Sequence, residues 1–374
     1  MYKKVKLQAF KTLSAFACYY IKNFMKKEIV AGKVLVTGGS GYLASWIVKL
    51  LLEQGRHVRT TVRNRKDTGK TAHLTSIAEN NPGMLEILEA DLLEPGSFDE
   101  AVAGCSAVIH AASPFKISGV KDPEKELVTP AVEGVRNLFG SIVRAGTVRR
   151  IVLTSSIAAI YGNAMEAEGV GGGHFNESHW NTTSSLTDLP YSYSKTLAEK
   201  EAWKLVGEMP GTEMAVINPG LILGPSLSRR VDATSVQLMR QITSGLFRLG
   251  VPRGKQAIVD VRDVAQAHVT AAFAPQASGR HIAAPHSIDF LDIARAIGSQ
   301  YPSLPLPKGY MPTWVFYIIG PLAGYSPSFI RKNFGYDLLF DNTRIRRELG
   351  IQFRPMEETV TDHVKQLKED ALLK

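Results

Sequence analysis

The sequence predicts an α/β fold, with a doubly wound parallel sheet followed by a smaller mixed C-terminal lobe. Short β-rich apolar runs alternate with amphipathic stretches through the first two-thirds of the chain, as in a parallel sheet covered by helices. After Gly224 and Pro225 this alternation weakens and the chain becomes mixed and proline-rich. With 374 residues, 44% of them hydrophobic, the chain can bury a full core.

Each element of the large sheet is predicted from its own apolar pattern. The expected strands cover residues 33–37, 58–62, 85–90, 107–112, 150–155 and 213–219. Helical patterns lie between them at 42–54, 97–103, 124–145 and 191–207. Later in the chain, a short β-run at 256–261 precedes a helical pattern at 263–273.

Charge and composition exclude several classes of protein. The formal net charge is +9, but residues 1–27 contain seven lysines and no acidic residue, which leaves +2 for the remainder. A nearly neutral body argues against a nucleic-acid partner. The two cysteines, Cys18 and Cys105, are too few for a disulfide framework, and the basic extension 1–32 lacks a signal-peptide profile. We therefore expect a cytoplasmic protein.

No transmembrane segment is expected either. The longest apolar run near the C-terminus, residues 314–324, is far shorter than the ~20 residues of a spanning helix. Gly320 and Pro321 also interrupt it.

The stretch VTGGSGYLA, residues 36–44, lies between an expected strand and an expected helix. Gly38 allows a tight turn, and Gly41 allows backbone N–H groups to approach a pyrophosphate closely. The following helix begins at Tyr42 and Leu43, and its N-terminus favours phosphate. Strand, glycine turn and helix together predict a Rossmann-type dinucleotide site, to which we assign these four residues.

The end of the second strand predicts which dinucleotide binds. Proteins that bind NAD usually place an acidic residue there to bond the ribose hydroxyls. Here the chain reads TTVRNRK, with Arg63 and no carboxylate before Asp67. A guanidinium can pair with a 2′-phosphate, so NADP(H) is the expected cofactor. Asp91, just after the third strand, is either an adenine-binding carboxylate or an ordinary turn aspartate.

The stretch YSYSK predicts the catalytic groups. Tyr191 and Lys195 stand four apart on an expected helix and share one face, whereas Tyr193 points elsewhere. An ammonium beside a phenol favours the phenolate and is expected to lower its pKa. Ser156, at the end of the fifth strand, can donate a hydrogen bond to a substrate carbonyl. Of Ser155 and Ser156, one is expected to face the interior.

These motifs together resemble a known family. The stretches VTGGSGYLASWIV, TVRN, ADLLEPGSFDEAVAGCSAVIHAASP, TSSIAAIYG, YSYSKTLAEKEAW, NPGLILGP and DVRDVAQAHV are similar to those of extended short-chain dehydrogenases/reductases. Within this superfamily, which includes NAD-dependent epimerases and dehydratases, the chain looks like a dihydroflavonol-4-reductase-like member. The resemblance covers roughly residues 33 to 350.

The resemblance implies roles for particular residues, of which Ser156, Tyr191 and Lys195 would be the catalytic set. The implied cofactor contacts are Arg63 and Lys70 at the 2′-phosphate, Asp91 and Leu92 at adenine, Ala111, Ala112 and Ser113 along the pyrophosphate and ribose, and Pro219 near nicotinamide, with Tyr191 and Lys195 also on the cofactor. Two departures bear on the substrate. Tyr161 stands where flavonoid-reducing members have a substrate-binding asparagine, and LPYSYSK replaces the Asn-Trp-Tyr signature of cinnamoyl-CoA reductases.

These inferences predict an NADPH-dependent reductase of an aldehyde or ketone, reversible as an alcohol dehydrogenase. Alternatives on the same site are a 3β-hydroxysteroid-type dehydrogenase and a nucleotide-sugar epimerase or dehydratase. A non-enzyme alternative is a regulatory protein that senses NADP.

The chain is expected to divide into the extension 1–32, an NADP-binding domain at 33–220 with 256–285 returning to it, and a substrate lobe at 221–255 and 286–374. The partner is a small carbonyl or alcohol substrate, and the protein is expected to be a monomer or homodimer.

The histidines do not predict a metal site. His174 and His179 lie five apart with Glu177 between them, and no further ligand cluster accompanies them. We expect this stretch to be a mobile loop that covers the substrate. His110 and His268 lie on apolar patterns and are expected to be core residues.

Overall fold

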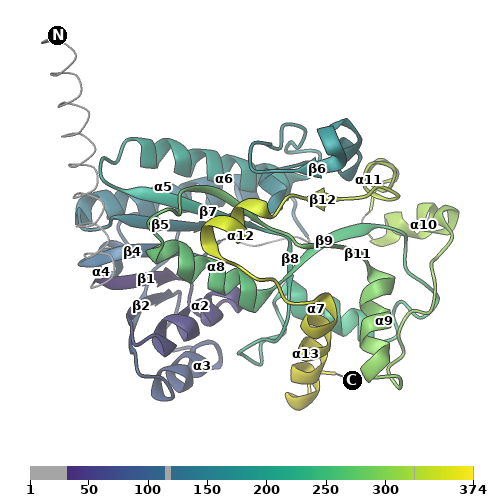
Figure 1. Cartoon of the computed structure of the whole chain (residues 1–374), viewed down its shortest axis with the longest axis horizontal. Coiled ribbons are helices and arrows are strands. Elements are labelled where there is room, and N and C mark those ends of the chain that lie inside the picture. Colours follow the sequence, from purple (N-terminus) through teal and green to yellow (C-terminus); the bar gives the residue numbers. More distant parts are fainter. Residues whose placement is uncertain (1–31, 114–118, 324, 374) are drawn as a thin grey trace, which may run out of the picture.

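The computed structural model describes residues 32–113, 119–323 and 325–373. A seven-stranded parallel sheet with the strand order β10-β7-β5-β4-β1-β2-β3 forms its centre (Figure 1). Its strands are β1 (Lys33–Thr37), β2 (His57–Val62), β3 (Met84–Glu89), β4 (Cys105–His110), β5 (Arg150–Thr154), β7 (Glu213–Pro219) and β10 (Gly279–Ala283). The order reverses between β1 and β4, where ligands bind in such sheets.

Helices cover both faces of this sheet because alternate residues of its buried strands point to opposite sides. Val34 and Val36 pack on one face with α2 (Tyr42–Glu53) and α8 (Val261–Phe273). Leu35 packs on the other face with α4 (Asp99–Val102), α5 (Thr129–Ala145) and α6 (Pro190–Gly207). The predicted doubly wound parallel sheet is confirmed.

Two helical predictions differ from the structure, and one helix was missed. Helix α3 (Thr68–Glu79) was not predicted, because it buries only Thr71 and Leu74 and so lacks an apolar stripe. The segment predicted as one helix at 124–145 begins with a π-helical turn, η1 (Glu124–Val128), before α5. The pattern at 97–103 gives only the four-residue α4.

The smaller part contains a mixed three-stranded sheet of β8 (Leu221–Leu223), β9 (Lys255–Asp260) and β11 (His286–Asp289). Within the segment 256–285, β9 belongs to this smaller sheet, while β10 pairs with β7 of the large one. The proposed domain boundaries stay a prediction. Further elements outside the large sheet are α7 (Thr234–Thr243), α9 (Phe290–Gln300), α10 (Thr313–Ile319), η5 (Gly320–Ala323), α11 (Pro327–Asn333), α12 (Thr343–Leu349), α13 (Met356–Glu369) and the paired strands β6 (His174–Phe175) and β12 (Leu339–Phe340).

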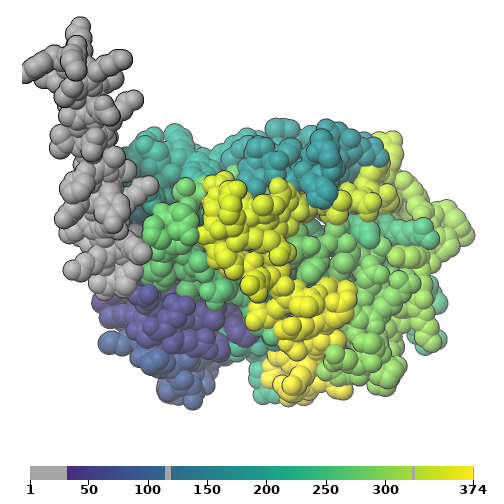
Figure 2. Space-filling model, viewed as in Figure 1, coloured from purple at the N-terminus to yellow at the C-terminus, as the bar shows by residue number. Residues whose placement is uncertain are grey.

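The last two helices connect the two sheets. Ile345 and Leu349 of α12 join the core of the large sheet, whereas Val360 and Val364 of α13 join the core of the smaller one. Figure 2 shows this C-terminal segment in yellow across the middle of the viewed face. Among the described helices, none combines the length and apolar character needed to span a membrane.

Gly224 holds the first and last of these described α-helices together. The Tyr42 hydroxyl of α2 donates to the Gly224 carbonyl at 2.5 Å, and the Gly224 N–H donates to His363 Nδ1 of α13 at 3.2 Å. The rings of Tyr42 and His363 are stacked, with their centroids 6.3 Å apart. Helices at opposite ends of the sequence therefore contact the same residue.

Three buried histidines predict a loss of stability in mild acid. Burial lowers the pKa of His110 to about 3, of His268 to about 4 and of His363 to about 3. As the pH falls below the ordinary value of ~6.5, the unfolded chain binds protons that the folded protein does not. The free energy of unfolding should therefore fall by up to ~4 kcal/mol per pH unit near pH 5 from these groups alone.

Urea unfolding at several values between about pH 5 and pH 7.5 measures this slope. We expect a shallower slope for His268→Gln. His174→Gln is the control, because His174 is exposed and its Nδ1 lies 2.7 Å from the carbonyl oxygen of the nearby Gly172. A free energy of unfolding that stays constant over this range contradicts the prediction.

Candidate active site

The glycine turn lies at the carboxyl end of β1, beside the point where the strand order reverses. Gly38 has a φ of +70°, which suits glycine. A Cβ on Gly39 would lie 2.1 Å from Thr60 Oγ1, and one on Gly41 would lie 3.1 Å from the Gly38 carbonyl oxygen. The turn therefore fits a group that must approach the backbone closely, as a pyrophosphate does.

The N-terminus of α2 faces out of this turn without a side-chain cap. Gly41 occupies the N-cap position and has no side chain to satisfy the first N–H groups of the helix, which begins at Tyr42 and Leu43. Such an end carries partial positive charge and binds anions. The geometry around the turn therefore fits the phosphates of a dinucleotide.

A side chain at position 39 should disrupt this turn. In Gly39→Ala the new Cβ would overlap Thr60, which is fully buried and donates to the Val36 carbonyl at 2.7 Å. Overpacking of this kind costs ~1–3 kcal/mol. We expect a lower free energy of unfolding by urea denaturation and at least ~10-fold weaker dinucleotide binding by fluorescence titration. Gly140→Ala is the control, because its Cβ would meet only Arg144 Nη1 at 3.4 Å; equal losses in both variants contradict the prediction.

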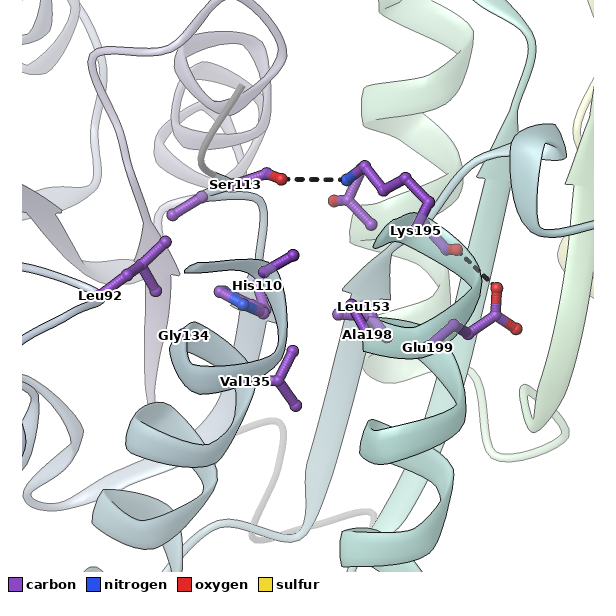
Figure 3. A pocket seen from close by; sticks show the side chains of 13 residues that line it. Leu92, His110, Ser113, Gly134, Val135, Leu153, Lys195, Ala198 and Glu199 are labelled. Atoms are coloured by element: carbon purple, nitrogen blue, oxygen red, sulfur yellow. Dashed lines mark hydrogen bonds between the residues drawn. The ribbon is translucent and has the colours of Figure 1, made fainter. Parts of the chain in front are cut away.

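Lys195 projects from α6 toward the residues that follow β4. Its Nζ donates to Ser113 Oγ at 3.1 Å, and Figure 3 shows the two side chains meeting across a small pocket. Ala112, also at the end of β4, donates its N–H to Thr37 Oγ1 at 3.0 Å and lines the same pocket. The structure thus brings Lys195 together with Ala112 and Ser113, which lie 83 and 82 positions before it in the sequence.

Tyr191 and Lys195 occupy successive turns of α6, as predicted, but their protonation differs from the expectation. Burial lowers the pKa of Lys195 to about 8, and the Glu199 carboxylate opposes part of that shift. Burial also raises the pKa of the Tyr191 phenol above its ordinary value. The expectation that Lys195 lowers the tyrosine pKa is therefore wrong for this state, because loss of solvation dominates. The phenol keeps its proton at neutral pH.

The two serines after β5 have different environments. Ser155 is buried and donates to Glu199 Oε2 at 2.5 Å. Ser156 is half-buried, and its Oγ accepts the N–H of Ala158 at 3.1 Å. Accepting leaves the Ser156 hydroxyl proton available for another oxygen. As expected, one serine faces the interior, and Ser156 is the one available to a ligand.

The predicted adenosine contacts lie at the ends of β2 and β3. Arg63 is exposed just after β2, and Lys70 of α3 pairs with Asp67 at 2.7 Å. Asp91 Oδ1 accepts the Leu93 N–H at 2.9 Å, as an ordinary turn aspartate does. Leu92 packs on α5 beside Gly134, so closely that a Cβ added to Gly134 would lie 3.2 Å from the Cβ of Leu92. Leu92 also lines the pocket near Lys195.

The remaining predicted residues are placed by the ends of the central strands. Ala111 follows β4, and Pro219 ends β7. The small pocket that contains Lys195 is not lined by five of the predicted residues, namely Ser156, Tyr191, Asp91, Arg63 and Lys70. The catalytic and cofactor-binding roles assigned to all these residues stay predictions.

A buried ion pair at α6 was not predicted. Glu199, one turn beyond Lys195, lies with its Oε1 2.7 Å from Arg280 Nε, and both side chains are almost fully buried. The Asn218 side-chain amide donates to Glu199 Oε2 at 2.8 Å. The only signal in the sequence is the four-residue spacing from Lys195, which puts Glu199 on the same face of α6.

Arg280 also fixes the loop around His174 and His179. It donates to the carbonyls of Glu177 at 3.2 Å and His179 at 2.5 Å, and its guanidinium stacks 3.9 Å from the Trp180 ring centroid. Glu177 in turn accepts the N–H of Ile282 at 3.1 Å. Side-chain and backbone contacts with β10 therefore hold residues 177–180 of this segment, and its mobility and its role as a substrate cover stay predictions.

The strand order, the uncapped helix at the glycine turn and the Tyr–Lys helix beside it define a dinucleotide-binding α/β protein of the dehydrogenase/reductase class. The family model described as "NAD dependent epimerase/dehydratase family" matches residues 34–284. The chain belongs to this family, as an enzyme of the extended short-chain dehydrogenase/reductase superfamily and of its dihydroflavonol-4-reductase-like group. The resemblance inferred from the sequence motifs is confirmed.

Similar proteins include several reductases. Cinnamoyl-CoA reductase CAD2 of Medicago truncatula is 34% identical over 92% of this chain and 98% of its own. Tetraketide alpha-pyrone reductase 1 of Arabidopsis thaliana is 33% identical over 91% of this chain and 97% of its own. The structure of yeast methylglyoxal/isovaleraldehyde reductase Gre2 complexed with NADPH is 28% identical, covers 91% of this chain and 99% of its own, and has a TM-score of 0.73.

Proposed function

We propose that the protein is an NADPH-dependent reductase of an aldehyde or ketone, with Ser156, Tyr191 and Lys195 as its catalytic residues. The observation that carries the proposal is the contact from Lys195 to Ser113, which points Lys195 of α6 toward the residues after β4, at the carboxyl edge of the large sheet. Tyr191 lies one turn earlier on the same helix. The similarity to reductases, one of them solved with NADPH, supports the same reaction class.

When bound, NADPH supplies the hydride for the carbonyl carbon. Tyr191 holds its proton because burial raises its pKa, so it can donate that proton to the carbonyl oxygen. Ser156 has a free hydroxyl proton with which to orient the same oxygen. Lys195, with a pKa of about 8, is charged at neutral pH and can bond ribose hydroxyls. Once Tyr191 has given its proton to the substrate, the ammonium can stabilise the phenolate that remains.

The surroundings of Tyr161 bear on the substrate. Its ring lies 5.3 Å from that of Phe175 and 5.7 Å from that of Phe340, measured between centroids. These contacts place Tyr161 in an aromatic cluster of the core. The position that holds a substrate-binding asparagine in flavonoid-reducing members is therefore used for packing here, and we propose a substrate other than a flavonoid.

The test is the loss of NADPH absorbance with the purified full chain and a panel of aliphatic and aromatic aldehydes and ketones. We expect turnover with NADPH and much weaker turnover with NADH. Tightly bound NAD in the purified protein, with no net oxidation of NADPH by any carbonyl, would support an epimerase instead. Binding of NADPH without turnover of any substrate would support a regulatory protein.

A further inference from the structure

Arg230 reaches from the smaller part of the protein onto the glycine turn. It lies in the segment between β8 and α7, and its Nη1 donates to the Ser40 carbonyl at 3.0 Å. Ser40 stands between Gly39 and Gly41, so the guanidinium lies directly beside the predicted phosphate-binding backbone. Only 24% of the Arg230 side chain is exposed. This side chain is therefore held in place next to the turn.

Asp232 fixes the orientation of that guanidinium. Its Oδ1 accepts from Arg230 Nε at 2.9 Å, and its Oδ2 pairs with Arg230 Nη2. A guanidinium carries five N–H donors in a planar fork, so these contacts and the one to Ser40 leave donors available. The fork is thus oriented before any ligand arrives, which reduces the entropic cost of binding an anion.

The charge of Arg230 also reaches the site expected for the 2′-phosphate. It lowers the pKa of Asp67, which Lys70 lowers more strongly through a hydrogen bond. It also helps burial to lower the pKa of His73. Conversely, Lys70 contributes to the lowered pKa of Asp232. Arg230 and Lys70 thus act on the same pair of carboxylates, Asp67 and Asp232, which balance their charges.

We propose that Arg230 is a third cation for the cofactor's 2′-phosphate, supplied by the smaller lobe to act with Arg63 and Lys70. The inference rests on the proposed function and adds to it a contact from outside the nucleotide-binding domain. The donors that Asp232 and Ser40 leave available can bind a phosphate with close to two negative charges, which the Asp232 carboxylate repels. Arg230 would then favour NADPH over NADH and connect cofactor binding to the position of the smaller lobe.

The test measures binding to the full-length protein without turnover. Calorimetry with 2′,5′-ADP reports affinity for the 2′-phosphate, and fluorescence quenching by NADH reports affinity for a nucleotide that lacks it. Loss of one charge-assisted bond predicts ~10- to 100-fold weaker binding of 2′,5′-ADP to Arg230→Gln. We expect the affinity for NADH to change less than ~3-fold, because no 2′-phosphate is present.

Two further variants separate recognition from a purely structural contact. Asp232→Asn keeps one side-chain oxygen that can accept from Arg230 Nε, so the guanidinium stays oriented, but it removes the negative charge that opposes the phosphate. It should strengthen 2′,5′-ADP binding, whereas a structural contact between lobes predicts weaker binding. Arg229→Gln is the matched control, because the neighbouring Arg229 is exposed and bonds the Asp370 carbonyl of the C-terminal segment instead. It should leave both affinities unchanged.

The outcomes also distinguish the inference from the proposed function. Wild-type protein that binds 2′,5′-ADP, with an Arg230→Gln variant that binds it equally well, contradicts the inference alone. An equal loss of 2′,5′-ADP and NADH binding in Arg230→Gln also contradicts it. Wild-type protein that binds neither 2′,5′-ADP nor NADPH contradicts the proposed function together with the inference.

Discussion

Replacing Tyr191 with phenylalanine should lower kcat by ~10²- to 10⁴-fold, because the reaction then loses its general acid. Phenylalanine fills nearly the same volume, so the packing of α6 should survive. NADPH affinity should change little, since the phosphate contacts lie at the glycine turn. Steady-state kinetics with the best carbonyl substrate and NADPH titration by fluorescence measure the two effects.

Tyr193 provides a control on the same helix. It is two residues from both Tyr191 and Lys195, so its side chain leaves α6 in another direction. Removing the Tyr193 hydroxyl in Tyr193→Phe should leave kcat within ~3-fold of the wild-type value. If Tyr191→Phe keeps normal turnover, or if the two variants lose it equally, the catalytic assignment of Tyr191 is wrong.

Replacing Glu199 with alanine should be the most destabilising single change in the site, lowering the free energy of unfolding by ~3–5 kcal/mol. The loss leaves the Arg280 guanidinium buried without its ionic partner and removes the acceptor of the Ser155 hydroxyl. Urea unfolding at pH 7 measures it. Glu201→Ala is the control, because Glu201 pairs with the exposed Arg136 and such surface pairs contribute ~0–1 kcal/mol.

A double variant tests the cause of the Glu199 effect. Glu199→Leu combined with Arg280→Met removes both charges together, and apolar replacements of buried ion pairs are often nearly neutral. We expect the double variant to be more stable than either single variant. Equal destabilisation by all three would show that the ion pair is not the source of the loss.

The sequence predicted those parts of the fold whose burial repeats regularly. Strands buried on both faces contain nearly continuous apolar runs, so β1 and β7 were predicted with their observed bounds. Helix α3 was missed because it lies at the surface and buries only two residues. The pairing of β9 with the smaller sheet depends on contacts with residues distant in sequence, so the local pattern at 256–261 could not show it.

The same distinction explains which parts of the candidate site were predicted. Tyr191 and Lys195 are four apart, and the glycine turn is contiguous, so short motifs reveal them. The contact between Glu199 and Arg280 spans 81 positions, and that between Arg230 and Ser40 spans 190. No local pattern connects such residues. The pKa of Tyr191 was misjudged for a related reason, since burial is a property of the folded protein.

The attachment of α2 and α13 to Gly224 has a consequence for how this chain acquires its final form. During synthesis the glycine turn leaves the ribosome early, whereas His363 emerges only after every strand of the large sheet. Until then Gly224 lacks one of its two hydrogen-bonding partners, and Tyr42 lacks the ring that stacks on it. Completion of the nucleotide end of the protein therefore waits for α13, and loss of that helix would be felt at α2, more than 300 residues earlier in the chain.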